Sequence, residues 1–173
     1  GHADSDGDGI ADYLDDSDDV TTLPASEDSD DVLQTDPGLR LKLGDVSAAS
    51  DKIVGLISDA EVEAEADDAG NATDEEFEHP LGLFDFAVDQ LPVPGASIRV
   101  VLPLPDVIPE GAVYRKFTES LGWQDFVEDD ANAVHSASAS GTGCPAVTSE
   151  DWVAGLTAGH DCVRLTIEDG GLN

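Results

Sequence analysis

The chain has 173 residues, of which 40% are hydrophobic, so it is long and apolar enough to bury one main core. Its formal net charge is -32, because 39 Asp and Glu outnumber 7 Lys and Arg. Such a charge repels phosphate groups, which excludes nucleic acids and anionic membrane surfaces as partners. Two compatible explanations for the acidity remain, namely divalent-cation sites and adaptation to salty surroundings.

Membrane insertion by this segment is not expected. The sequence has no apolar run long enough to cross a bilayer, and it does not open with the charged and apolar regions of a secretion signal. It begins with Gly-His and starts and stops within polar sequence, so we expect a piece of a longer protein. A signal or an anchor would then lie outside it.

The first predicted element is an acidic loop over residues 4–15, D-S-D-G-D-G-I-A-D-Y-L-D. Acids at alternate positions around a glycine turn are typical of an EF-hand-type calcium loop. The predicted ligands, at loop positions one, three, five, seven, nine and twelve, are Asp4, Asp6, Asp8, the Ile10 carbonyl, Asp12 and Asp15. An EF-hand prefers Glu at the last position and has an amphipathic helix on each side, and this chain has neither. The alternative is a solvated acidic linker that matches the pattern by chance.

The remaining N-terminal sequence predicts a linker. Residues 1–36 contain acids but no Lys or Arg, and too few large apolar side chains to form a core. From Gly38 the pattern changes, because Leu39, Leu41 and Leu43 alternate with basic residues as in a half-buried strand. We therefore expect a calcium-binding loop and linker over 1–36 and a folded domain over 37–173.

Five further segments, bounded by Gly and Pro, have the same period of two. They are Leu83–Val88, Ile98–Leu104, Ala112–Phe117, Trp123–Val127 and Cys162–Glu168. In the last of these, Val163, Leu165 and Ile167 are expected to face the core and Arg164 to face water. Many short strands with turns between them predict an all-β fold, an antiparallel β-sandwich of the jelly-roll or Ig-like kind.

One short helix is predicted between the two cysteines. Ser149 is a suitable N-cap, Trp152 and Leu156 lie one turn apart, and Gly159 would end the helix. The segment from Ser58 to Asp74 consists mainly of Ala, Asp and Glu, and we expect an exposed strand or loop there.

Cys144 and Cys162 are the only cysteines. A disulfide between them would stabilise the fold by about 3 kcal/mol in the chain-entropy model. Calcium and a disulfide would both indicate an extracellular protein, but two buried free thiols would fit two cysteines equally well. Their spacing fits no zinc pattern.

Several motifs along nearly the whole chain point to one family. They are D-S-D-G-D-G-I-A-D-Y-L-D-D, T-D-P-G-L-R-L-K-L-G, G-L-F-D-F, V-V-L-P-L, Y-R-K-F, G-W-Q-D-F, G-C-P and C-V-R-L-T-I-E-D-G-G. With these motifs the chain resembles the bacterial choice-of-anchor U domain, and its leading loop resembles a thrombospondin type 3 calcium repeat. The resemblance implies a disulfide between Cys144 and Cys162. It also implies a module near the C-terminus of a secreted bacterial protein, ahead of a cell-surface sorting signal.

The family pattern usually continues from I-E-D-G-G into another calcium-type loop, whereas this sequence stops at Asn173. Glu168 and Asp169 would then belong to an incomplete metal site.

Two functions without catalysis are expected, in order of preference. The first is a calcium-stabilised extracellular module of a bacterial cell-surface protein of the adhesin type, which spaces or presents the neighbouring domains of that protein. The second is a ligand-binding module that recognises a peptide or glycan through exposed aromatic side chains, with Trp152 and Trp123 as candidates. Most aromatic residues of so aromatic-poor a chain are needed for the core, which favours the first.

An enzyme is disfavoured, because no nucleophile elbow, zinc-protease helix, phosphate loop or dinucleotide fingerprint occurs. His135 lies beside Ser136, and His160 beside Asp161. Adjacent residues on a strand point to opposite faces, so these neighbours are weak evidence for a catalytic pair.

Overall fold

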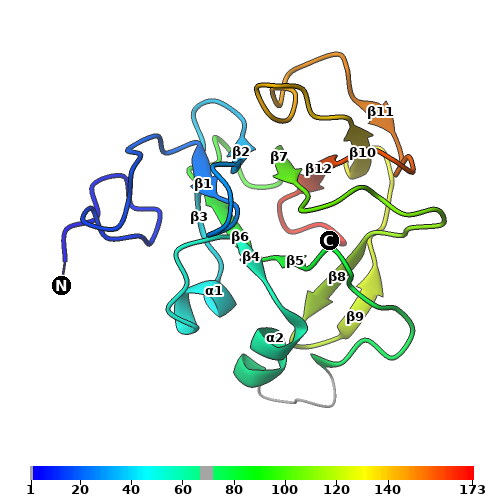
Figure 1. The fold of residues 1–173 in the computed structure, drawn as a ribbon, viewed down its shortest axis with the longest axis horizontal. Helices are drawn as coiled ribbons and strands as arrows, with labels where there is room; N and C mark the ends of the chain where they lie inside the picture. Colours follow the sequence, from blue (N-terminus) through cyan, green and yellow to red (C-terminus); the bar gives the residue numbers. More distant parts are fainter. Residues whose placement is uncertain (1, 67–71) are drawn as a thin grey trace.

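The computed structural model describes residues 2–66 and 72–173, and its fold is mostly β. One antiparallel sheet contains, in spatial order, β1 (Thr22–Pro24), β2 (Val32–Thr35), β7 (Ser97–Pro103), β12 (Cys162–Glu168), β10 (Ala133–Ala137) and β11 (Val153–Ala154) (Figure 1).

Three smaller antiparallel pairs accompany this sheet. They are β3 (Arg40–Leu43) with β6 (Phe86–Asp89), β4 (Leu56–Ile57) with β5 (Leu83–Phe84), and β8 (Arg115–Thr118) with β9 (Gly122–Asp125). The helices α1 (Asp45–Ala49) and α2 (Asp59–Glu65) lie on the side of the molecule away from the six-stranded sheet (Figure 1). Neither helix of the described ranges is long and apolar enough to span a membrane.

The main core lies against one face of the six-stranded sheet. The central strands β7 and β12 pair along their whole length, from Ser97 opposite Glu168 to Pro103 opposite Cys162. Their inward side chains, Val100 and Leu102 on β7 and Val163 and Leu165 on β12, are almost completely buried. Leu41 of β3 joins the same cluster from the smaller pairs. Each fully buried aliphatic side chain of this kind contributes about 1.5–3 kcal/mol.

The opposite face of the sheet is covered as well. Val101, Ala137 and Cys162 form a second apolar cluster with Val147 and Trp152 of the segment that precedes β11. The guanidinium of Arg164 lies 5.3 Å from the centre of the Trp152 ring and donates to the Val147 carbonyl. Arg164 therefore lies under a loop, whereas the period-two pattern predicted that it would face water.

Both edges of the six-stranded sheet are short. The strand β1 has three residues and ends at Pro24, and β11 has two residues. Proline has no amide hydrogen with which to extend a strand ladder.

The structure differs from the linker predicted over residues 1–36. Thr22–Pro24 and Val32–Thr35 are strands of the main sheet, and β2 pairs with the central strand β7. Leu23 and Leu33 are fully buried in the main core. The prediction missed these strands because each has only one large core side chain, set among polar and acidic residues.

The predicted helix between the cysteines is wrong. Residues 149–159 form turns and the strand β11, and Gly155, in the middle of the predicted helix, has a φ of +83°, which a right-handed helix does not accommodate. A helix forms instead over Asp59–Glu65, where a strand or loop was expected. Ser58 and Glu61 form a reciprocal capping box at its start. Residues 67–71 of the same expected segment lie outside the described residues.

The strands with the strongest period-two pattern are confirmed. β3, β7 and β12 each agree with a predicted segment to within one residue at either end, and Leu39, Leu41 and Leu43 are buried as expected. The segment Leu83–Val88 is divided into two strands that pair with different partners. β8 begins only at Arg115, and β4, β10 and β11 were not predicted.

Candidate metal centre

The acidic loop folds three carboxylates toward one point. Ligand oxygens of Asp4, Asp6 and Asp8 all lie within 4.8 Å of one another. Gly7 and Gly9, with φ of +77° and +98°, provide left-handed backbone conformations on either side of Asp8. The Asp4 carboxylate accepts hydrogen bonds from both glycine amides, at 2.7 and 3.2 Å, so the loop is held in this shape by its own backbone.

Two of these carboxylates are buried. Asp6 is 8% exposed and Asp8 is 1% exposed, and Asp6 Oδ2 has no hydrogen-bond partner among the described residues. Burial, together with the charges of Asp6, Asp15 and Asp4, raises the pKa of Asp8 to about 7. Burial also raises the pKa of Asp6. The charge of Arg40 acts on Asp4 and Asp6. A buried carboxylate oxygen without a hydrogen bond is nevertheless costly, so the cluster favours a proton or a further cation.

The loop is attached to the main core. Ile10 is 2% exposed and belongs to the same apolar cluster as Leu43. The Leu43 amide donates to the Asp8 carbonyl at 2.8 Å, and the Leu41 amide donates to the Val20 carbonyl at 2.8 Å. The acidic turn and the segment that follows it are therefore fixed to strand β3.

The other predicted ligands lie outside the three-residue cluster. The Asp12 carboxylate accepts hydrogen bonds from the Ser5 amide at 2.6 Å and from the Ser5 hydroxyl at 2.9 Å. Asp15 accepts from the Ser17 amide at 3.0 Å, yet its charge acts on both Asp6 and Asp8. The Ile10 amide donates to Asp8 at 2.7 Å. The structure thus brings together the first three ligands of the predicted set.

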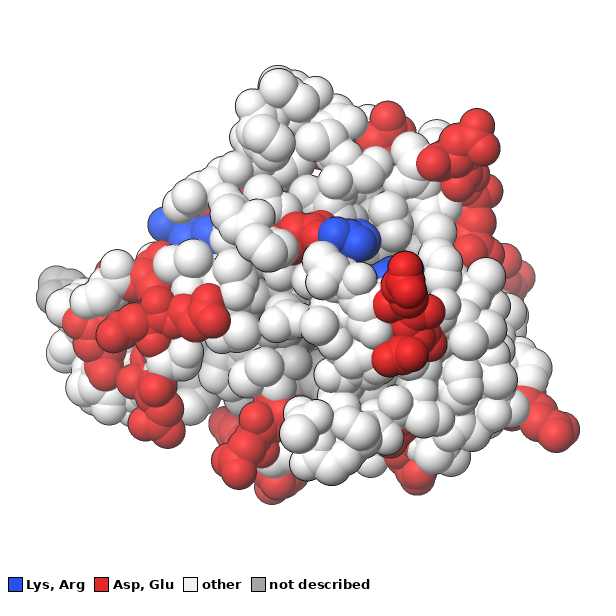
Figure 2. Space-filling view, turned by 90° about the horizontal axis from the view of Figure 1, so that it is seen from above, with Lys and Arg blue, Asp and Glu red and all other residues white. Residues whose placement is uncertain are grey.

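The end of the molecule that contains this loop is densely acidic. Figure 2 shows Asp and Glu gathered at the left, where Figure 1 places the N-terminal segment. Lys and Arg occupy only small areas of the face seen in Figure 2. A divalent cation approaching this end would be attracted before any ligand contact formed.

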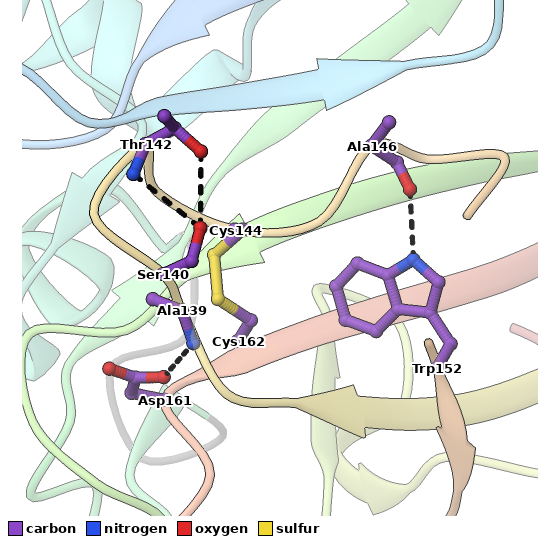
Figure 3. The surroundings of a disulfide bond; sticks show 8 residues. All are labelled: Ala139, Ser140, Thr142, Cys144, Ala146, Trp152, Asp161 and Cys162. Carbon is purple, nitrogen blue, oxygen red and sulfur yellow. Dashed lines mark hydrogen bonds between the residues drawn. A yellow bond between two sulfur atoms is a disulfide. The ribbon is translucent and has the colours of Figure 1, made fainter. Parts of the chain in front are cut away.

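The disulfide implied by the family resemblance is present. Cys144 and Cys162 are bonded, with Cα atoms 5.8 Å apart (Figure 3). It joins the first residue of β12 to the loop over the outer face of the sheet. Nearby, the Asp161 carboxylate accepts from the Ala139 amide at 2.6 Å, and the Trp152 indole donates to the Ala146 carbonyl at 3.0 Å. These contacts fix the loop at several points.

The two candidate ligand-binding tryptophans both pack within the fold. Trp152 is 8% exposed and its indole nitrogen is already bonded. Trp123 is half-buried, lies 4.3 Å from His79 between ring centres, and donates to the Ala72 carbonyl. Neither indole is an exposed platform of the kind that glycan recognition uses.

One serine–histidine pair that the sequence did not suggest does form. Ser136 is fully buried, and its Oγ lies 3.0 Å from His160 Nδ1. The same hydroxyl donates to the Gly155 carbonyl at 2.8 Å and accepts from the Thr157 amide at 2.9 Å. Because its one proton is used by Gly155, the histidine nitrogen must donate rather than act as a base. This arrangement joins β10 to the loop before β12, and His135 lies on the opposite face.

No family model, curated protein or solved structure matches this chain. The function of the chain is therefore inferred from its own residues. Three hard carboxylates, two of them buried and one with an unpartnered oxygen, fit a cation that prefers oxygen ligands.

Proposed function

We propose that the chain is a non-catalytic, calcium-stabilised extracellular module of a bacterial cell-surface protein, of the adhesin type, which spaces or presents neighbouring domains. In this proposal the six-stranded sheet and the smaller pairs form an antiparallel β-sandwich. The N-terminal loop is its calcium site.

The observation that supports a cation most directly is the buried Asp6 Oδ2, which has no hydrogen-bond partner in the described part of the chain and lies beside the nearly inaccessible Asp8. Buried carboxylates are normally paired or coordinate a metal. Asp4, Asp6 and Asp8 would hold the ion. The sequence pattern adds Asp12, Asp15 and the Ile10 carbonyl as further oxygens, which together approach the six to eight that calcium takes.

The ion would fix the loop to strand β3 and to the main core. Asp8 and Ile10 belong to the loop, yet the Asp8 carbonyl is bonded to Leu43 and the Ile10 side chain lies in the main core. Neutralising the carboxylates would remove their repulsion and hold these contacts together. Binding free energy would then add to the free energy of unfolding, by about 2.7 kcal/mol when calcium is present at 100 times its Kd.

The extracellular location is supported by the disulfide, since such bonds persist in oxidising compartments. A passive role is supported by the Ser136–His160 pair, in which the hydroxyl is fully engaged with backbone groups. The alternative, recognition of a peptide or glycan by Trp152 and Trp123, has less support because Trp152 is 8% exposed.

The proposal is tested by calorimetric titration of chelator-treated protein with calcium, followed by thermal unfolding with and without the ion. The wild type is expected to bind calcium and to melt at a higher temperature with it. Asp8→Asn should lose most of this binding, while Asp30→Asn, in the exposed acidic run of residues 27–31, should retain it. Absence of heat at millimolar calcium, together with an unchanged melting temperature, would reject the proposal.

A further inference from the structure

A cavity of about 570 Å³ lies between the inner face of the six-stranded sheet and the smaller strand pairs. Its walls include Val163, Leu165 and Ile167 from β12, and Phe84, Phe86 and Phe126 from the opposite side. Volumes of 300–1,000 Å³ with mostly apolar walls are typical of small-molecule sites. The cavity is independent of the acidic loop, none of whose residues lines it.

One polar group in the cavity wall has no partner. Tyr114 lines the cavity, and its ring meets Phe126 edge-on at 5.8 Å between centres. Its hydroxyl forms no hydrogen bond with any residue of 2–66 or 72–173, and it is not one of the fully buried atoms without a partner, so a molecule in the cavity can reach it. A tyrosine hydroxyl within an apolar wall normally finds a hydrogen-bond partner. An acceptor atom on a bound molecule would provide one.

The cavity opens to solvent. Phe77 and Val113 belong to its lining, yet they are 39% and 47% exposed, so apolar side chains reach the surface at its entrance. Glu78 and Glu110 also line the cavity and are exposed. An apolar molecule can therefore enter from solvent past carboxylates.

The basic side chains that line the cavity already have partners within the protein. Arg115 forms ion pairs with Asp74 at 2.9 Å and with Asp125 at 2.7 Å. Lys116 donates to the Leu172 carbonyl. No basic group of the described lining is therefore left to pair with a ligand carboxylate, and the net charge of -32 repels anions generally. The occupant that fits is uncharged.

We propose that this cavity binds a small, neutral, mostly apolar molecule whose oxygen accepts a hydrogen bond from Tyr114. The apolar walls provide affinity by removing hydrocarbon surface from water. The hydroxyl orients the ligand, and the acidic entrance excludes fatty-acid-like anions.

The test uses Prodan, a neutral fluorescent dye whose ketone can accept the hydrogen bond. Its fluorescence is titrated with the intact chain at pH 8, in calcium and again in chelator. The expected result is saturable binding of one dye per chain. Unlabelled 1-decanol should displace the dye, and decanoate, of the same chain length but charged, should not.

Three variants locate the site. Ala112→Phe adds a ring at the cavity wall and should weaken dye binding at least tenfold, whereas Val153→Phe, on the exposed edge strand β11, should leave it unchanged. Tyr114→Phe should weaken Prodan about two- to tenfold, as expected for one hydrogen bond. Circular dichroism checks that each variant is folded.

The proposal is overturned if Prodan does not saturate at one site, or if folded Ala112→Phe binds it as the wild type does. Equal displacement by decanoate and decanol would overturn the choice of a neutral ligand. The competition uses only the wild type, so it remains decisive if Ala112→Phe does not fold.

Discussion

The backbone amide of Leu43 donates a hydrogen bond of 2.8 Å to the carbonyl oxygen of Asp8. One of the proposed calcium ligands is thereby joined to strand β3. A change in the charge of the loop is for this reason expected to alter the stability of the whole domain, and it should be measurable as such.

Without calcium, the domain should lose stability as the pH rises. Burial raises the pKa of Asp8 from 3.8 to about 7, so between these values the native state holds a proton that the unfolded state has released. The free energy of unfolding should fall from about pH 4 to about pH 7, on the order of a few kcal/mol, and then level off. Denaturant unfolding in chelator at several pH values measures this.

Saturating calcium should abolish that loss, because the ion stabilises the charged carboxylate. Asp8→Asn, which cannot ionise, should flatten the curve in chelator. A wild-type curve that rises through this range in chelator would contradict the raised pKa of Asp8.

Ile10→Ala should destabilise the domain by about 2–5 kcal/mol, since Ile10 is 2% exposed within the main core. Leu14→Ala provides the control in the same segment. Because Leu14 is 48% exposed, this substitution should hardly change the free energy of unfolding. Chemical denaturation of both variants in calcium gives the comparison. Equal effects would show that the loop is not packed on the core.

Replacing both Cys144 and Cys162 by Ser should lower the free energy of unfolding by about 3 kcal/mol, mainly because the unfolded chain gains freedom. The measurement is thermal unfolding of the double variant beside the wild type with and without reductant. Reductant should lower the melting temperature of the wild type toward that of the double variant. It should leave the melting temperature of the variant unchanged. A wild type as unstable as the double variant before reduction would argue against the bond.

Gly44→Ala should lower the free energy of unfolding by about 1–3 kcal/mol, because a Cβ on Gly44 would lie 2.0 Å from Asp85 Oδ1. The Asp85 carboxylate would have to move and would lose its 2.7 Å hydrogen bond from the Ser47 amide. Gly141→Ala is the matched control, since a Cβ there meets nothing within 4 Å. Denaturant midpoints compare the two; a loss in Gly141→Ala as large as in Gly44→Ala would contradict this account.

Sequence alone predicted the elements whose side chains alternate strictly. Leu39, Leu41 and Leu43 identified β3, and Val163, Leu165 and Ile167 identified β12. The β1 strand was missed because Leu23 is its only fully buried residue. That burial is produced by pairing with β2 and packing on residues distant in the sequence, which no local pattern contains.

The acidic loop could be recognised from its spacing, but its geometry could not. Alternation placed Asp4, Asp6 and Asp8 in one set, and the structure brings these three together. The same spacing could not reveal that Asp12 bonds to Ser5, which competes for a carboxylate that the pattern assigns to the ion. The Ser136–His160 contact was also beyond prediction, because it joins residues 24 positions apart.

The short outer strands have a consequence for contacts between copies of the chain. An exposed strand edge can pair with the edge of a neighbouring chain, extend the ladder and form fibres. In the six-stranded sheet the β1 edge has three residues, and its Pro24 carbonyl already accepts a hydrogen bond from the Gly55 amide. The β11 edge has only Val153 and Ala154. A second copy therefore finds few backbone groups with which to extend this sheet.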